Sequence, residues 1–312
     1  MKAKYYLYFT TIFFASSCAT IKDASIRQQL TSSKCYQANE YHYTEKDLPI
    51  SLSKSGLETS PLSKKISQNS LYIANIIGII PYLKEYNDIK SSNKQLTLEE
   101  RVHLLEIEQV MDQKINNASL IVSAVSSELD CEEERTSQIA NYIKDKEDDL
   151  ESKLTIGAIV LGATGAILTG GVIKDETASN VVGISTGVGE AMLGLTMLFN
   201  KRKVDFDHQR NILTDIWLGP TTSKLIPAFI WYYLTNDYNG QPSLRIEIIE
   251  KWDHFGQIDN DSEKLANLYF GKGGKYTADQ LSNRANMYDQ LESQIYLLKQ
   301  KLMTLANEID EI

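Results

Sequence analysis

The chain is poor in the residues on which several protein classes depend. Its 312 residues include only 3 cysteines and 4 histidines, and its 32 basic residues are outnumbered by 41 acidic ones. Three cysteines are too few for a disulfide-built scaffold, and a net charge of −9 gives no general attraction for nucleic acid. The histidines lie at no metal-ligand spacing, and no nucleophile motif accompanies them. We therefore predict no enzyme activity, no metal, no other cofactor and no nucleic-acid partner.

The amino end has the features of an export signal. Two lysines precede an apolar run, residues 5–14, which is too short to span a bilayer as a helix. Three small residues, at 15–17, then lead directly to Cys18. They are Ala15, Ser16 and Ser17. This segment resembles the lipobox of bacterial lipoproteins, in which the cysteine becomes the lipidated first residue of the mature chain. An ordinary secretory signal cut near Cys18 and an uncleaved anchor are the alternatives.

The lipoprotein resemblance implies a location. It implies export across the inner membrane, removal of residues 1–17 and a membrane partner reached through acyl chains on Cys18. Several acyl chains anchor stably, because each buried methylene contributes about 0.8 kcal/mol. Ala19 follows the cysteine, and lipoproteins without aspartate there resemble those sorted to the outer membrane. We expect a lipid anchor in that membrane, on its periplasmic or cell-surface face.

The two other cysteines then form an even set. Once Cys18 carries lipid, Cys35 and Cys131 remain in an oxidising compartment. We predict a disulfide between them, which would tie the amino-terminal segment to a long helix. Two separate thiols are the alternative.

Two segments carry seven-residue apolar repeats that are typical of packed helices. Thr97 and Glu100 form a capping box, and no proline lies between Pro81 and Pro220, so we predict one helix over residues 98–170. Its seam consists of Met111, Ile115, Ala118, Val122, Val125 and Leu129. The second seam, near the carboxyl end, consists of Tyr288, Leu291, Ile295, Leu298, Leu302, Leu305 and Ile309. We expect the two helices to pack on each other, with self-association as the alternative.

Shorter elements are predicted elsewhere. Residues 62–80 have helical periodicity that Pro81 kinks or ends, and residues 200–220 also have a helical pattern. Apolar and charged residues alternate over 244–248, which predicts a short strand. Residues 271–275 are rich in glycine and lysine but fail the phosphate-loop spacing, so we predict a flexible turn.

A helical hairpin is predicted where nine of the 17 glycines gather. Residues 154–173 carry no charge and are long enough to cross about 30 Å of hydrocarbon. A second apolar run, residues 178–199, is interrupted only by Glu190. In each run small residues recur every four positions and so share one helix face. They are Ala158, Gly162, Ala166 and Gly170 in the first run, and Ser179, Gly183, Gly187 and Ala191 in the second. Such faces let helices approach closely.

The sequence leaves open what surrounds this hairpin. The first possibility is a second membrane contact through residues 154–199. The alternative is a hairpin buried in a soluble bundle or oligomer. Glu190 favours the alternative, because a carboxylate at the centre of a spanning helix costs about 2.5–3.5 kcal/mol.

The fold class predicted is mainly α. We expect an elongated antiparallel helical bundle or coiled coil, with a glycine-rich helical hairpin and a small aromatic-rich α+β subdomain. The expected divisions are a signal peptide (1–17), a lipidated tether with an irregular segment (18–60), a bundle with the long helix (61–153), the hairpin (154–199), a helix with the aromatic-rich subdomain (200–276) and a carboxyl-terminal coiled-coil helix (277–312).

Two classes of function fit this organisation. The first is a lipid-anchored envelope protein with a structural or protein-interaction role, acting with a protein partner or as a homo-oligomer. The second is a membrane-inserting or pore-forming subunit. In organisation the chain is similar to helical pore-forming toxins, which carry an apolar hairpin on a long helical bundle.

Overall fold

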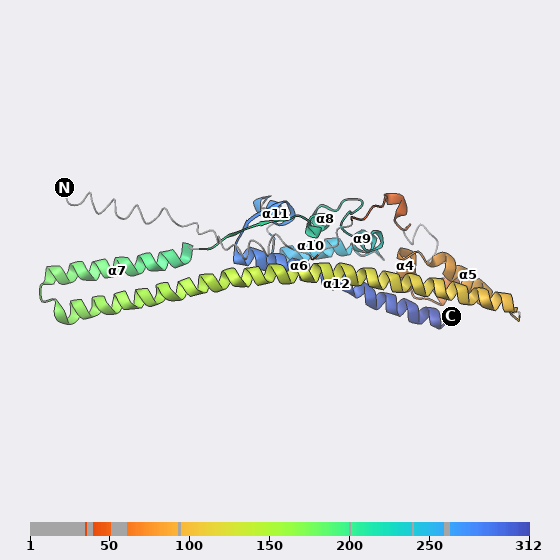
Figure 1. The fold of residues 1–312 in the computed structure, drawn as a ribbon, viewed down its shortest axis with the longest axis horizontal. Helices are drawn as coiled ribbons and strands as arrows, with labels where there is room; N and C mark the ends of the chain where they lie inside the picture. The colour runs from red at the N-terminus through yellow and green to blue at the C-terminus, as the bar shows by residue number, and fades with distance from the viewer. Residues whose placement is uncertain are drawn as a thin grey trace. The chain divides into compact units, whose positions relative to one another are not determined.

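The computed structural model describes residues 35, 40–50, 61–92, 95–199, 201–238, 240–258 and 263–312. Within them the chain is mainly α, as predicted (Figure 1). The expected signal peptide and Cys18 lie outside the described residues. The described chain forms two compact units. The hairpin unit contains residues 135–207 and 273–283, and the bundle unit contains residues 33–134, 208–272 and 284–312.

One continuous helix, α6 (Leu98–Ile167), contributes to both units. It begins at the predicted capping box, where the Glu100 amide donates to Thr97 Oγ1 at 3.2 Å and the Thr97 amide donates to the Glu100 carboxylate at 2.9 Å. It continues into a π-helical turn, η5 (Leu168–Val172). The predicted long helix is therefore confirmed.

In the bundle unit, α6 packs antiparallel against α12 (Ala278–Asp310) (Figure 1). Lys299 Nζ on α12 donates to Ser123 Oγ on α6 at 3.0 Å. Glu292, seven residues earlier on α12, interacts electrostatically with Asp130, seven residues later on α6. Every predicted seam residue on both helices is buried. The partner of the carboxyl-terminal seam is thus α6 of the same chain, as expected.

Shorter helices complete the bundle unit and enclose an aromatic cluster. They are η2 (Glu45–Asp47), η4 (Pro61–Lys64), α4 (Gln68–Ile76), α5 (Ile80–Lys90), α8 (Ile212–Leu218), α9 (Ala228–Thr235), α10 (Leu244–His254) and α11 (Glu263–Phe270). Phe270 stacks on Trp217 with ring centroids 4.5 Å apart, and it also stacks on Trp252. Trp231 and Trp252 are fully buried. The aromatic-rich region therefore supplies part of the core.

One helix prediction and one strand prediction need correction. The pattern over residues 62–80 is divided, because α4 ends before Gly78, which has a positive φ of 70°. Pro81 lies in the first turn of α5 instead of ending a helix, since an amide is not needed at that position. The predicted strand over residues 244–248 is wrong, because these residues begin α10. Ile248 and Trp252, four residues apart, are the buried face of that helix.

The two-stranded sheet lies in segments for which the sequence predicts no strand. Residues 200–220 are not one helix: β1 (Val204–Asp207) precedes α8. The glycine-rich segment predicted as a flexible turn forms β2 (Gly273–Tyr276), which pairs antiparallel with β1. The register joins Val204 to Tyr276, and Phe206 packs on the Tyr276 ring at 5.8 Å. Both strands belong to the hairpin unit.

The predicted cysteine pair is present. Cys35 and Cys131 form a disulfide with Cα atoms 5.4 Å apart, across a sequence separation of 96 residues. It ties residue 35 to the middle of α6.

Replacing Cys131 by serine is expected to lower the free energy of unfolding by about 2–4 kcal/mol, because the unfolded chain loses a long cross-link. The measurement is urea unfolding, with a mobility comparison on a non-reducing gel. Wild-type protein treated with a reductant is the control and should match the variant. Equal stability of oxidised and reduced wild type would contradict a structural role for this bond.

Candidate functional site

The carboxyl-terminal part of α6 and α7 (Glu176–Phe199) form the hairpin, with η5 and residues 173–175 at its tip (Figure 1). Asp175 Oδ1 accepts the Ala178 amide at 2.9 Å and so caps the first turn of α7. Ser179 Oγ donates to the Thr169 carbonyl across the hairpin at 3.3 Å. The predicted glycine-rich hairpin is therefore present, and both arms lie within one compact unit.

Glycines of α6 bring the two arms close together. A Cβ added at Gly162 would overlap the Glu190 carboxylate, and one added at Gly165 would overlap the Thr186 side chain. A Cβ at Gly157 would contact Leu193 Cδ1 at 3.8 Å. Side chains of α7 therefore occupy the space that these glycines leave open.

The eight residues of the predicted small-residue faces do not all meet between the arms. Those that are half-buried are Ala158, Gly162 and Ser179. Those that are exposed are Ala166, Gly170, Gly183, Gly187 and Ala191. A Cβ added at Gly170 or Gly187 would meet no atom within 4 Å. The four-residue repeat is thus not the contact between the arms along its whole length. The larger residues Thr186, Glu190 and Leu193 supply the inner face of α7.

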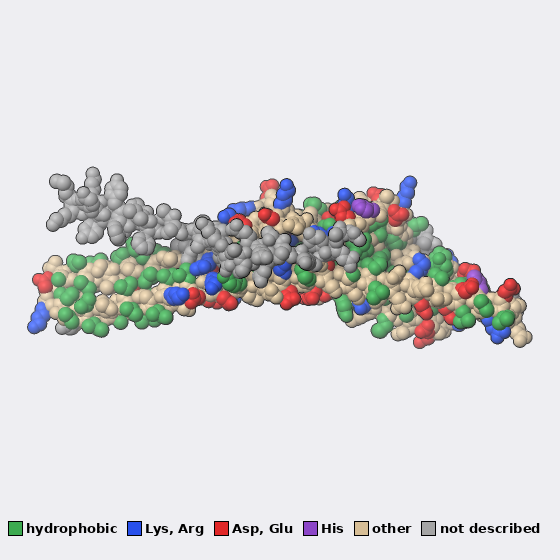
Figure 2. All heavy atoms as spheres, in the orientation of Figure 1, with side chains coloured by type: hydrophobic (Ala, Val, Ile, Leu, Met, Phe, Trp, Pro, Cys, Tyr) green, Lys and Arg blue, Asp and Glu red, His purple; other side chains and the backbone are tan. Residues whose placement is uncertain are grey.

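The outer faces of both arms are apolar and exposed. Ten large hydrophobic residues of the hairpin have exposed fractions of 40–68%, and hydrophobic side chains cover much of both arms (Figure 2). They are Ile156, Ile159, Val160, Leu161, Ile167, Val172, Val181, Ile184, Val188 and Leu195. By length and composition, the helix taken as Leu98–Gly170 is apolar enough to cross a membrane, and only 6% of its apolar window is buried. Exposed apolar surface of this extent marks a contact with lipid or protein.

Four threonine hydroxyls in the hairpin are satisfied within their own helices. Four donate to the carbonyl four residues earlier, at 2.7–3.1 Å. They are Thr164, Thr169, Thr186 and Thr196. These hydroxyl protons therefore need no water, which suits a helix in an apolar environment as well as one in water.

Glu190 is the one ionisable residue in the body of the hairpin, because residues 154–173 and 177–199 otherwise contain no acid, base or histidine. Its side chain is turned toward Gly162 on the opposite arm and is half-buried. At 1.5 Å per residue it lies about 21 Å along α7 from Glu176 and about 14 Å from Phe199. The charge thus sits near the middle of the hairpin, on its inner side.

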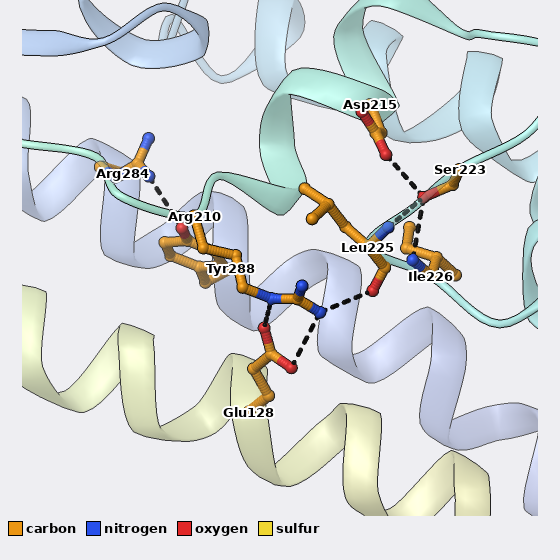
Figure 3. A network of polar contacts seen from close by, with 8 residues as sticks. All are labelled: Glu128, Arg210, Asp215, Ser223, Leu225, Ile226, Arg284 and Tyr288. Carbon is orange, nitrogen blue, oxygen red and sulfur yellow. Dashed lines mark hydrogen bonds and ion pairs between the residues drawn. The ribbon is translucent and has the colours of Figure 1, made fainter. Parts of the chain in front are cut away.

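A polar groove in the bundle unit is the second candidate. It has a volume of about 490 Å³ and is lined in part by His208, Arg210, Thr214, Asp215 and Lys272. Glu128 holds Arg210 with a 2.7 Å ion pair, and Arg210 Nη2 donates to the Leu225 carbonyl at 3.0 Å (Figure 3). Thr214 Oγ1 donates to the Phe270 carbonyl at 2.7 Å.

The polar groups in and beside the groove form hydrogen bonds with one another and with the backbone. Ser223 Oγ donates to Asp215 at 2.5 Å and accepts the amides of Leu225 and Ile226 (Figure 3). Burial raises the pKa of Asp215, and it also raises the pKa of Glu128 in spite of the nearby arginine. Among the described residues, no three His, Cys, Asp or Glu side chains are placed to hold a metal ion. We therefore regard the groove network as structural.

No protein family, curated protein or solved structure matches this chain. Among the described residues, the exposed apolar surface of the hairpin is the feature that indicates a contact with lipid or protein.

Proposed function

We propose that this chain is a lipid-anchored protein of the bacterial envelope whose hairpin, residues 154–199, enters a lipid bilayer. The exposed apolar outer faces of α6 and α7 carry this proposal. Removing apolar surface from water contributes about 25 cal/mol for each Å², so a bilayer that covers both faces stabilises the inserted hairpin.

The dimensions of the hairpin fit a bilayer. Residues 154–173 would span about 30 Å as a helix, and the 24 residues of α7 span about 36 Å. Charged residues occur at both ends: Lys153 and Lys201 at the base, and residues 174–176 at the tip. Apolar arms bounded by charges are the pattern of segments that cross hydrocarbon.

The position of Glu190 weakens the main objection to a lipid environment. A carboxylate facing lipid at the bilayer centre costs about 2.5–3.5 kcal/mol. Glu190 is directed at Gly162 inside the hairpin and is half-buried, so the opposite arm shields only part of its charge from lipid. A protein assembly around the hairpin is the alternative, and it would have to cover the outer faces of both arms.

The amino-terminal lipid supports the same proposal. The resemblance of residues 15–18 to a lipobox implies acyl chains on Cys18, and Ala19 after the cysteine implies sorting to the outer membrane. A tethered hairpin meets the bilayer at a high effective concentration, which favours insertion. The packed pair of α6 and α12 then gives the anchored chain a helical body for contacts with other envelope components.

A pore-forming role is the second candidate. Gly187 and Ala191 lie exposed on α7, and a Cβ added at Gly187 would meet no atom within 4 Å. Small residues at four-residue spacing on a lipid-facing surface allow close helix packing between copies, which a pore requires and a single anchored hairpin does not.

The test uses the unlipidated chain from Ala19 to Ile312, in which Cys35 and Cys131 are bonded to each other. Ile184→Cys then supplies the single free thiol for an environment-sensitive dye. With phosphatidylcholine vesicles we expect a blue shift of the dye emission and quenching by lipid-borne quenchers, because residue 184 enters hydrocarbon. Leu120→Cys, on the bundle part of α6 and equally exposed, is the matched control and should show neither.

The two positions are compared at pH 7.5 and pH 4.5. No change at residue 184 at either pH would overturn the proposed insertion, and equal changes at both positions would also contradict it, since that indicates general adsorption. Release of a dye trapped in the vesicles would favour the pore-forming role. Insertion without release would favour a structural anchor.

A further inference from the structure

Glu190 has no ionisable neighbour in the hairpin. The stretch of α6 that packs on α7, from residue 154 to its end, contains no titratable or charged side chain, and neither does the rest of α7 after Glu176. The nearest charges along the chain are Lys153 and Lys201 at the base and residues 174–176 at the tip. The electrostatic cost of moving the hairpin body into lipid therefore depends on one carboxyl group.

The lack of a side chain at Gly162 leaves room for the Glu190 carboxyl group. The space that a Cβ at residue 162 would fill is occupied by the Glu190 carboxylate. The neighbouring Thr186 hydroxyl donates to the carbonyls of Val182 and Gly183, so its proton is directed along α7. The hairpin thus holds Glu190 on its inner side without supplying a cation to balance the charge.

From this arrangement we infer that Glu190 makes entry of the hairpin into a bilayer depend on pH, with the uncharged acid as the form that enters. The inference rests on the proposed function. Transfer to hydrocarbon is much less unfavourable for a neutral acid than for a carboxylate. The state that holds more protons gains population as pH falls, and the membrane state is that state. Insertion therefore increases with acidity.

The expected size of the effect follows from the depth of the residue. A charge near the centre of a spanning helix changes partitioning roughly a hundredfold on insertion scales. The change is therefore sought between a neutral and an acidic pH. Acidification thus shifts the hairpin further toward the bilayer.

Vesicle flotation of the chain from Ala19 to Ile312 tests the inference at pH 7.5 and pH 4.5, with phosphatidylcholine vesicles that carry no net charge. Wild type should bind roughly a hundredfold more strongly at pH 4.5. Glu190→Gln should bind equally at both values, within about threefold, and as strongly as acidified wild type. Glu176→Gln is the matched control at the end of the same helix, and it should keep the pH dependence of wild type.

The outcomes separate this inference from the proposed function. Equal wild-type binding at both pH values would overturn the pH dependence and leave insertion standing. Full pH dependence in Glu190→Gln, or its loss in Glu176→Gln, would also overturn the inference, since another group would then carry the effect. Absence of binding by all three proteins at both pH values would overturn the proposed insertion itself. Circular dichroism at pH 4.5 checks that the helices remain folded.

Discussion

The double variant Ile159→Lys, Ile184→Lys is expected to bind phosphatidylcholine vesicles more than a thousandfold more weakly than wild type. The two side chains lie on the outer faces of α6 and α7, with exposed fractions of 66% and 68%. Exchanging isoleucine for lysine within a spanning helix costs about 3 kcal/mol for each residue. The pair thus opposes insertion by about 6 kcal/mol, and a thousandfold change requires only about 4 kcal/mol.

The matched control places the same charges elsewhere on equally exposed positions. Leu105 and Leu120, with exposed fractions of 64% and 67%, lie on the bundle part of α6. The control variant Leu105→Lys, Leu120→Lys should leave vesicle binding within about threefold of wild type. Neither double variant should change the free energy of unfolding by more than about 0.5 kcal/mol per site. Flotation is measured at whichever of pH 7.5 and pH 4.5 gives stronger wild-type binding. Equal loss in both variants would show that net charge, not the hairpin surface, decides binding.

The long helices could be predicted because their signal repeats many times. Seams that continue over several heptads leave few alternatives, and each of the two helices begins at a capping box. Thr277 and Gln280 show this at the start of α12, where the Gln280 amide donates to Thr277 Oγ1 at 3.3 Å. Local hydrogen bonds and periodic burial point to the same element there, which is why sequence and structure agree.

The small sheet could not be predicted by local reasoning. β1 and β2 have four residues each and lie far apart in sequence, since Val204 pairs with Tyr276. β2 begins with two glycines, which are poor strand formers alone. Only the partner strand makes extended backbone favourable at Gly273, so the information is non-local. The opposite error at residues 244–248 has a similar cause, because five alternating residues fit a strand as well as one turn of α10.

The sequence predicts the length of the hairpin arms and the spacing of their small residues, but not which face of each arm meets the other arm. Small residues recur at steps of three or four on more than one face of α7, and a repeat alone does not say which face meets α6. That choice depends on fit between side chains. Thr186 and Glu190 fill the space beside Gly165 and Gly162, and as a result Gly187 is turned outward. A periodic pattern thus specifies the spacing of the small residues, while side-chain packing specifies which face of α7 meets α6.

Truncation of Leu298 to alanine is expected to lower the free energy of unfolding by about 3–5 kcal/mol, because the side chain is fully buried in the α12 seam. The loss combines the transfer of apolar surface with a cavity that the two helices cannot fully close. Leu297→Ala is the matched control on the adjacent residue, which is 40% exposed, and should cost less than about 1 kcal/mol. Urea unfolding followed by circular dichroism measures both.

The same variant distinguishes packing within one chain from self-association. Lys299 contacts Ser123, so Val122 and Val125 lie on α6 at the level of Leu298. If α12 packs on α6 of its own chain, the unfolding midpoint of wild type and of Leu298→Ala is independent of protein concentration, because no second molecule enters the equilibrium. Val125→Ala combined with Leu298→Ala should then cost less than the sum of the single changes, since both enlarge one cavity. A midpoint that rises with concentration would instead assign the seam to a second copy of the chain.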